Sequence, residues 1–97
     1  MKSVFITYDQ AHQDNVIDAL NESNVRGYTF FEGVGGRGTK GGEPHLGTHA
    51  WPSMNSAIIT AVEDAQVEPL LNRLHILDLE NPLLGLRAFV WNIEQSI

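Results

Sequence analysis

The chain has no cysteine among its 97 residues, so it forms neither disulfide bridges nor thiolate metal sites. It also lacks a long apolar segment, because no run approaches the roughly 18 residues that a membrane-spanning helix needs. The N-terminal residues, MKSVFITYDQ, do not contain the apolar core of a secretory signal. These absences predict a cytoplasmic protein that does not insert into a membrane.

Basic residues are also few. The six Lys and Arg are scattered along the chain and are outnumbered by twelve Asp and Glu, which gives a net charge of −6. This balance argues against a nucleic-acid partner, because neutralising phosphates requires clustered Lys and Arg. The remaining composition, 42% hydrophobic and 19% charged, is that of an ordinary globular protein. The length suits one core, so residues 1–97 are expected to form a single domain.

Runs of β-branched and aromatic residues predict four strands. They lie at residues 4–8, 28–32, 56–62 and 86–93. One helix is predicted at 10–23, and a second begins at 64, where leucines recur at helical spacing until the break at Asn81-Pro82. Asp9 and Asp64 are the predicted N-caps and Gly27 is the predicted end of the first helix. Pro69 is placed in the first turn of the second helix.

This order, βαββαβ, is typical of the ferredoxin-like α+β fold, in which a four-stranded antiparallel sheet carries two helices on one face. The strands have few polar positions on either face. Their aromatic residues are too numerous to fit under two helices: Phe5, Tyr8, Phe30, Phe31 and Trp91. An exposed apolar sheet face of this size marks an interface, and it predicts a closed symmetric oligomer with its sheets packed together.

Seven of the nine glycines lie between Gly33 and Gly47, in a long connection that spans residues 33–55. A connection of this length in a compact domain is normally functional or disordered, so function is expected here. Bare backbone amides can converge on an anion, and Arg37 and Lys40 supply cations, which favours phosphate binding. The standard glycine-rich phosphate-binding motifs are incomplete, however, and a merely solubilising loop is the alternative.

The same loop carries His45 and His49, four residues apart, with Glu43 close by. Imidazole suits Zn, Cu and Ni, and a carboxylate can complete such a site. Two histidines are fewer than a full coordination shell, which symmetric copies of the chain could complete at an oligomer interface. The alternative is that both are ordinary polar loop residues. The sequence shows no nucleophile motif and no convergent carboxylate pair, so an enzyme is not predicted.

Two short segments, together with the βαββαβ order, resemble the PII signalling superfamily. Gly33-Val34-Gly35-Gly36-Arg37 followed by Lys40-Gly41 is similar to the entry of the PII T-loop. Arg87-Ala88-Phe89-Val90 is similar to the Lys-Ile-Phe-Val segment of the last PII strand. The resemblance implies a homotrimer, nucleotide clefts between subunits, and a mobile loop that docks on a partner, often a membrane transporter. It makes four residues the candidates for nucleotide or anion binding: Gly35, Arg37, Gly38 and Arg87.

The chain departs from the standard PII pattern in two places. The phosphate-binding Gly-Asp-Gly before the last strand is replaced by Leu84-Gly85-Leu86, and the T-loop tyrosine that is modified in standard members is missing. The segment from Pro44 to Pro52 instead resembles divergent PII-like proteins that are associated with heavy-metal efflux pumps. The divalent-cation tolerance proteins, which are related trimers of the same fold, make a metal role chemically sensible.

The favoured function is therefore a PII-like trimeric regulator that binds a transition metal through His45, His49 and Glu43 and docks on a transporter. Two alternatives stay open. A nucleotide- or anion-sensing regulator of the same family would use the glycines and arginines of the loop entry and of the last strand. A small dimeric ferredoxin-like enzyme would have a pocket in the sheet.

Overall fold

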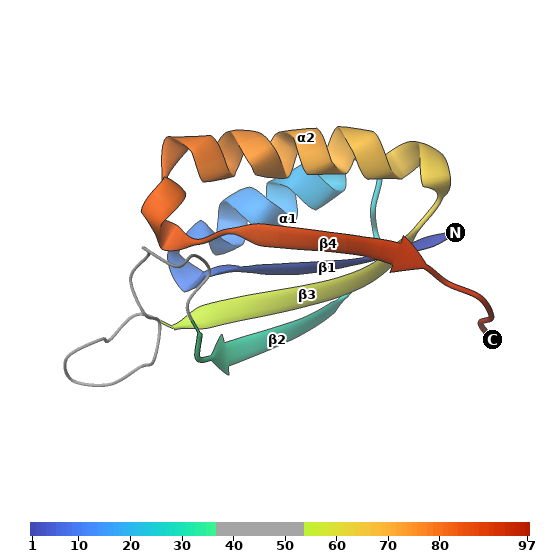
Figure 1. Cartoon of the computed structure of the whole chain (residues 1–97), viewed down its shortest axis with the longest axis horizontal. Helices are drawn as coiled ribbons and strands as arrows, with labels where there is room; N and C mark the ends of the chain where they lie inside the picture. The colour runs from blue at the N-terminus through green and yellow to red at the C-terminus, as the bar shows by residue number, and fades with distance from the viewer. Residues whose placement is uncertain (37–53) are drawn as a thin grey trace.

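The computed structural model describes residues 1–36 and 54–97. In chain order, its elements are β1 (Lys2–Asp9), the 3-10 helix η1 (Gln10–His12), α1 (Gln13–Glu22), β2 (Thr29–Val34), β3 (Asn55–Val62), α2 (Asp64–Glu80), the 3-10 helix η2 (Pro82–Leu84) and β4 (Arg87–Asn92). The strands form a sheet in the order β2-β3-β1-β4 with antiparallel neighbours. Both α-helices cover the same face of it (Figure 1). The predicted ferredoxin-like fold is confirmed.

The hydrophobic core lies between the sheet and the helices. Alternate residues of β1 contribute to it, since Val4, Ile6 and Tyr8 are completely buried. Ile58 of β3 lies opposite Ile6 and is also completely buried. The helices add buried aliphatic side chains: Val16, Leu20, Leu70 and Leu74. Burial of each side chain of this size stabilises the fold by roughly 1.5–3 kcal/mol. The positions of these side chains therefore determine which face of the sheet packs against the helices.

The helical segment begins at Gln10 as predicted, but its first turn is the 3-10 helix η1, and α1 itself begins at Gln13 and ends before Gly27. The Asp9 carboxylate accepts a hydrogen bond from the amide of Ala11 at 2.7 Å, which caps η1 ahead of α1. At the other end, Asn24 has a φ of 61°, and the amide of Val25 donates to the carbonyl of Leu20 at 2.9 Å. This is the Schellman arrangement, with asparagine as its left-handed residue and a buried valine behind it. The prediction that Gly27 ends the helix was therefore wrong.

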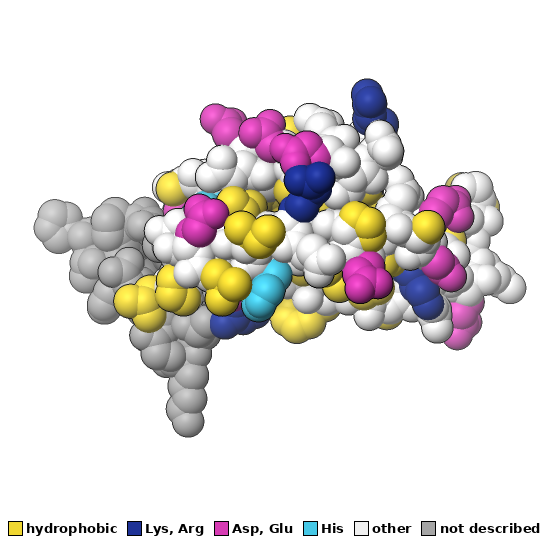
Figure 2. All heavy atoms as spheres, turned by 90° about the horizontal axis from the view of Figure 1, so that it is seen from above, with side chains coloured by type: hydrophobic (Ala, Val, Ile, Leu, Met, Phe, Trp, Pro, Cys, Tyr) yellow, Lys and Arg dark blue, Asp and Glu magenta, His cyan; other side chains and the backbone are white. Residues whose placement is uncertain are grey.

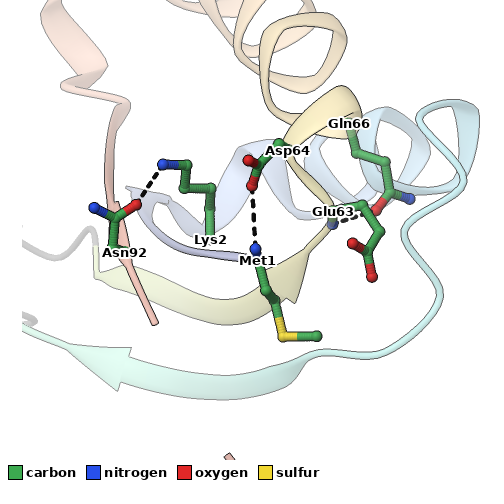
Figure 3. Close-up of polar contacts among 6 residues, drawn as sticks. All are labelled: Met1, Lys2, Glu63, Asp64, Gln66 and Asn92. Carbon is green, nitrogen blue, oxygen red and sulfur yellow. Dashed lines mark hydrogen bonds and ion pairs between the residues drawn. The ribbon is translucent and has the colours of Figure 1, made fainter. Parts of the chain in front are cut away.

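The second helix begins with a capping box. Glu63, not the predicted Asp64, is the N-cap, and its amide donates to the Gln66 side chain at 2.8 Å while its own side chain bonds the Gln66 amide (Figure 3). Asp64 instead lies 3.1 Å from the Met1 nitrogen. Gln66 also donates to the carbonyl of Asn24 at 3.0 Å, which ties the start of α2 to the end of α1. Pro69 lies beyond the first turn of α2, contrary to the prediction. No helix in the described part of the chain is long and apolar enough to span a membrane.

The second face of the sheet carries apolar side chains that the helices do not cover. Phe31 is 47% exposed, Trp91 is 47% exposed and Phe89 is 55% exposed. Phe5 is half-buried between Ile59 and Phe89, its neighbours in the register. The expected exposed aromatic face therefore exists in the described residues, and two of the five aromatic residues do not belong to it. Tyr8 is completely buried under the helices, and Phe30 packs against the core.

Candidate functional site

A hollow of about 490 Å³ lies on the uncovered sheet face where the glycine-rich connection leaves β2. We call it the loop-root hollow, and it is lined by Phe5, Thr7, Phe31, Val34, Gly35, Gly36, Asn55 and Ala57. The pairing of β2 with β3 shifts register between Phe31 and Val34, and Gly33 within that shift has a φ of 66°. Glycine adopts this left-handed conformation without steric cost, and it allows the irregularity within β2 before Val34 pairs with Asn55.

Asn55 is the most informative polar residue of this hollow. Its side chain is only 6% exposed, and its Oδ1 has no hydrogen-bond partner among the described residues. A buried carbonyl oxygen without a donor is energetically unfavourable, so such a group is a candidate for contact with a ligand. Gly36 lies against it, because a Cβ at Gly36 would come within 3.2 Å of Asn55 Nδ2. The glycine therefore gives the carboxamide room at the edge of the hollow.

The chemistry of the loop-root hollow is neutral. Its lining includes aromatic and aliphatic side chains, the Thr7 hydroxyl, the Asn55 carboxamide and the backbone of Gly35 and Gly36, but no charged side chain among the described residues. Apolar walls with a small number of placed polar groups are typical of small-molecule sites. The hollow can therefore hold a flat or compact ligand that both accepts hydrogen bonds from backbone amides and donates one to Asn55.

Arg87 lies at a different hollow, of about 380 Å³, between α2 and β4. Arg87 pairs with Thr7 in the register. Because β4 is an edge strand, the Arg87 side chain can extend past it toward α2, and the guanidinium lies 3.2 Å from the Asp78 carboxylate. The same nitrogen donates to the carbonyl of Leu86 at 2.6 Å. His75 and Asn72 also line this hollow. Gly85, with a φ of 73°, closes η2 and directs the chain into β4 at this point.

Within one chain, the predicted nucleotide-binding residues do not meet. Gly35 follows β2 and Arg87 begins β4, and these strands are the two opposite edges of the sheet. Three inter-strand spacings separate them, or roughly 14 Å. A ligand that contacted both within one chain would have to bridge the full width of the sheet. Arg37 and Gly38 lie outside the described residues.

The predicted metal ligands Glu43, His45 and His49 also lie outside the described residues, and their role stays a prediction. The described ranges 1–36 and 54–97 contain no group of three His, Cys, Asp or Glu side chains that could hold a metal ion. Sequence reasoning missed Asn55 and Thr7. A signal for Asn55 was present, because it is a polar residue that opens an otherwise apolar strand directly after the glycine-rich connection.

Besides Asn55 and Thr7, one more polar side chain, that of Tyr8, lies near the start of α1. Its hydroxyl donates to Gln13 Oε1 at 2.6 Å, and its ring is completely buried. Burial raises the pKa of Tyr8 to about 12, with a hydrogen bond to Ser56 acting in the opposite direction. A phenol with so high a pKa stays protonated at neutral pH, so its role is to pair with Gln13 rather than to exchange protons.

Comparison with known proteins places this geometry in context. The family model described as nitrogen regulatory protein P-II matches residues 1–97. None of the curated protein sequences matches the chain significantly.

Solved structures resemble the chain along nearly its whole length. CPII, a nitrogen regulatory PII-like protein from Thiomonas intermedia, bound to ADP, AMP and bicarbonate, is 26% identical with a TM-score of 0.78, over 95% of this chain and 84% of CPII. A CPII structure with ADP, AMP and acetate is 27% identical with a TM-score of 0.70, over 99% and 88% of the two chains. A PII-like signalling protein from Thermus thermophilus is 21% identical with a TM-score of 0.66, over 95% and 85%, which shows a common fold.

Proposed function

Because this chain belongs to the nitrogen regulatory protein P-II family, we propose that it is a regulator whose interactions change when the loop-root hollow binds a small effector. The buried, unpaired Oδ1 of Asn55 in that hollow is the observation that carries the proposal. A group of this kind is satisfied when a donor from outside the described residues, such as a ligand or an ordered water, reaches it. Binding of the effector would therefore be sensed at the root of the long loop.

The effector that we propose is an adenine nucleotide together with bicarbonate. CPII has been solved with ADP, AMP and bicarbonate, and with acetate as the anion. The hydroxyl of bicarbonate and the amino group of adenine are both donors that suit Asn55 Oδ1. The amides of Gly35 and Gly36 are the available donors for an anionic oxygen at the same hollow.

We propose further that the functional unit is a homotrimer, as the family resemblance implies. The uncovered face with Phe31, Phe89 and Trp91 supports association, because exposed apolar surface of this kind is normally covered. The resemblance also implies nucleotide clefts between subunits, and we propose that in such a cleft the loop-root hollow of one chain faces Arg87 at the β4 edge of another. In sedimentation, the protein is expected to have three times the 10.7 kDa mass of one chain. A monomer or a dimer would remove this support for a site shared between chains.

The long loop is proposed to have two further roles, docking on a partner and binding a metal ion. The long loop would dock on a partner, for which a membrane transporter is the candidate that the resemblance implies. A transition metal at Glu43, His45 and His49 is the other effector that the loop sequence favours, and it would act at residues distinct from the loop-root hollow. Metal and nucleotide binding can therefore be tested separately with variants of one chain.

Calorimetric titration with AMP, ADP and sodium bicarbonate, singly and together, tests the proposal on the wild type, Asn55→Ala and Asn55→Asp. Loss of the acceptor in Asn55→Ala is expected to weaken binding by about tenfold, the scale of one buried hydrogen bond. Asn55→Asp keeps an acceptor but adds a negative charge. Because of this charge, Asn55→Asp should strongly lower the affinity for bicarbonate. A hydrogen bond from the adenine amino group would be kept.

Asn15→Asp is the matched control, since it makes the same amide-to-acid change at an exposed residue of α1. It should titrate like the wild type. A wild type that gives no heat with any of these ligands would refute the choice of effector. Equal affinities for the wild type and Asn55→Ala would remove Asn55 from the site.

A further inference from the structure

The outer surface of the helical layer is strongly acidic. Helix α1 contains Asp14, Asp18 and Glu22 and no Lys or Arg, and α2 contains four acidic residues and a single basic one, Arg73. Figure 2 looks onto this layer and shows acidic side chains gathered over α1 with apolar ones beside them over α2. Most acidic residues of the described part of the chain are therefore carried by α1 and α2, on the side of the sheet opposite the loop-root hollow.

The acidic residues of α1 form a row. Asp14, Asp18 and Glu22 follow each other at intervals of four, which places them on one side of the helix. Glu22 is paired with Arg73 of α2. In the described part of the chain neither Asp14 nor Asp18 has an ion-pair partner. Like charges at this spacing weaken a helix, and a cation placed beside them would relieve the repulsion.

An apolar stripe follows the acidic row. Ile76 is 55% exposed and Leu79 is 64% exposed, and they lie three residues apart on α2. Leu83, in η2, is 61% exposed. A groove of about 230 Å³ between the helices has Asp18 and Glu22 on one wall and Ile76 and Leu77 on the other. This groove therefore brings Asp18 of the acidic row beside Ile76 of the apolar stripe, and Arg73, which is paired with Glu22, lies in the same lining. Asp14, Leu79 and Leu83 are not among its lining residues.

We propose that this docking face, made of Asp14, Asp18, Ile76, Leu79 and Leu83, binds a basic amphipathic helix of a partner protein. The apolar side of such a helix would cover Ile76 and Leu79, and Lys or Arg on its flank would meet Asp14 and Asp18. The charge distribution favours this occupant over the others. A second copy would bring like charge against like charge, and an anionic membrane or a nucleic acid would be repelled. The inference goes beyond the proposed effector binding, because it concerns the opposite face of the sheet.

The test uses a fluorescently labelled synthetic peptide that places leucines on one helical face and lysines beside them. A second peptide, with glutamate at every lysine position, is the charge-reversed probe. Fluorescence anisotropy is measured without effector, so failure of effector binding and failure of docking are distinguishable. The wild type is expected to bind the lysine peptide, with an affinity that falls as salt rises, and to leave the glutamate peptide free.

Two double variants separate the docking face from net charge. Asp14→Lys with Asp18→Lys is expected to lower the affinity for the lysine peptide by about tenfold or more, since two exposed ion pairs become repulsive. Glu32→Lys with Glu94→Lys changes the net charge equally but leaves the face intact, so the loss should stay under about threefold. Ile76→Ser with Leu79→Ser removes the apolar contact and should also weaken binding by about tenfold. Circular dichroism checks that each variant folds.

Four results would overturn the proposal. One is equal weakening by the two lysine double variants, which would show attraction to net charge alone. Another is unchanged binding in Ile76→Ser with Leu79→Ser, or equal binding of the glutamate peptide. The fourth is a smaller sedimenting mass for Ile76→Ser with Leu79→Ser, which would assign the stripe to contacts between copies of the chain.

Discussion

Replacing Gly33 with alanine isolates the backbone strain at the root of the long loop. Gly33 has a φ of 66°, a conformation that costs an L-residue roughly 1–2 kcal/mol. Space is not the obstacle, because a Cβ there would meet only Met54 Cε at 3.9 Å, an ordinary contact. Alanine also lowers the entropy of the unfolded chain, which offsets roughly 0.4–1 kcal/mol. The expected net effect is a loss of about 1 kcal/mol in the free energy of unfolding.

Two further variants test whether the strain is the cause. Gly27→Ala changes a glycine that has no positive φ and nothing within 4 Å of its new Cβ. Only the unfolded-state term applies there, so this variant should be more stable than the wild type by roughly 0.4–1 kcal/mol. Gly33→Asn places a residue that tolerates the left-handed region, and it should lose less stability than Gly33→Ala.

Urea unfolding at one fixed protomer concentration is the assay, since association makes apparent stability depend on concentration. The difference of about 1 kcal/mol corresponds to a melting temperature lower by roughly 4–8 °C for a domain of this size. The reasoning fails if Gly33→Ala and Gly27→Ala change stability in the same direction and by the same amount. It also fails if Gly33→Asn is less stable than Gly33→Ala.

The remaining predictions concern pH and metal. Because the pKa of Tyr8 rises from 10.0 in the unfolded chain to about 12 in the fold, its contribution to stability is complete below pH 10 and is lost as the pH rises toward 12. A pKa difference of this size corresponds to a loss of about 2–3 kcal/mol, and Tyr8→Phe should flatten this part of a pH series of urea unfolding; equal slopes in both proteins would contradict the assignment. In calorimetry with Zn, Cu or Ni salts, His45→Ala with His49→Ala should abolish the heat of binding while leaving the bicarbonate titration unchanged. Metal binding that survives this double change would refute the predicted ligands.

The fold was predictable because its elements are marked by strong local patterns. The uninterrupted β-branched and aromatic run at residues 4–8 and the leucine spacing of α2 left little ambiguity about type or order. The same run explains why the sequence does not assign Tyr8 to either face of the sheet. Both faces of β1 are apolar, so the sequence contains no alternation that says which residues lie under the helices. That assignment comes only from the pairing of β1 with β3 and β4.

Helix ends were harder to predict because neighbouring residues compete for the same role. Asn24 and Gly27 can both adopt a left-handed conformation, and the buried Val25 behind Asn24 decides between them. Glu63 and Asp64 are adjacent carboxylates. The choice follows from Gln66, which stands three residues after Glu63 as a capping box requires. This signal was present in the sequence, whereas the packing of Val25 was not.

The candidate site was predictable in part for a similar reason. Glycine at positions 35 and 36 allows a ligand to approach the backbone closely, so the glycine content of the connection identified the loop root. The sequence places Asn55 directly after the connection but does not show that it is buried there, because its burial depends on its pairing with Asp9 of β1 and Val34 of β2. A site formed by three strands is a property of register, and register is set by the whole sheet.

The two proposed binding surfaces lie on opposite faces of one sheet, and a short covalent and hydrogen-bonded path connects them. The amide of Gln10 donates to the carbonyl of Met54 at 3.0 Å, next to Asn55 at the loop root. Gln10 begins η1, which leads directly into the helix that carries Asp14 and Asp18. A shift of the loop root on effector binding would therefore act on the start of α1. Coupling of this kind is reciprocal. Bicarbonate and nucleotide should therefore change the affinity of the protein for the lysine peptide by the same factor by which the peptide changes the affinity of the protein for bicarbonate and nucleotide. Equal peptide affinities with and without effector would show that the path carries no coupling, although both sites could still exist.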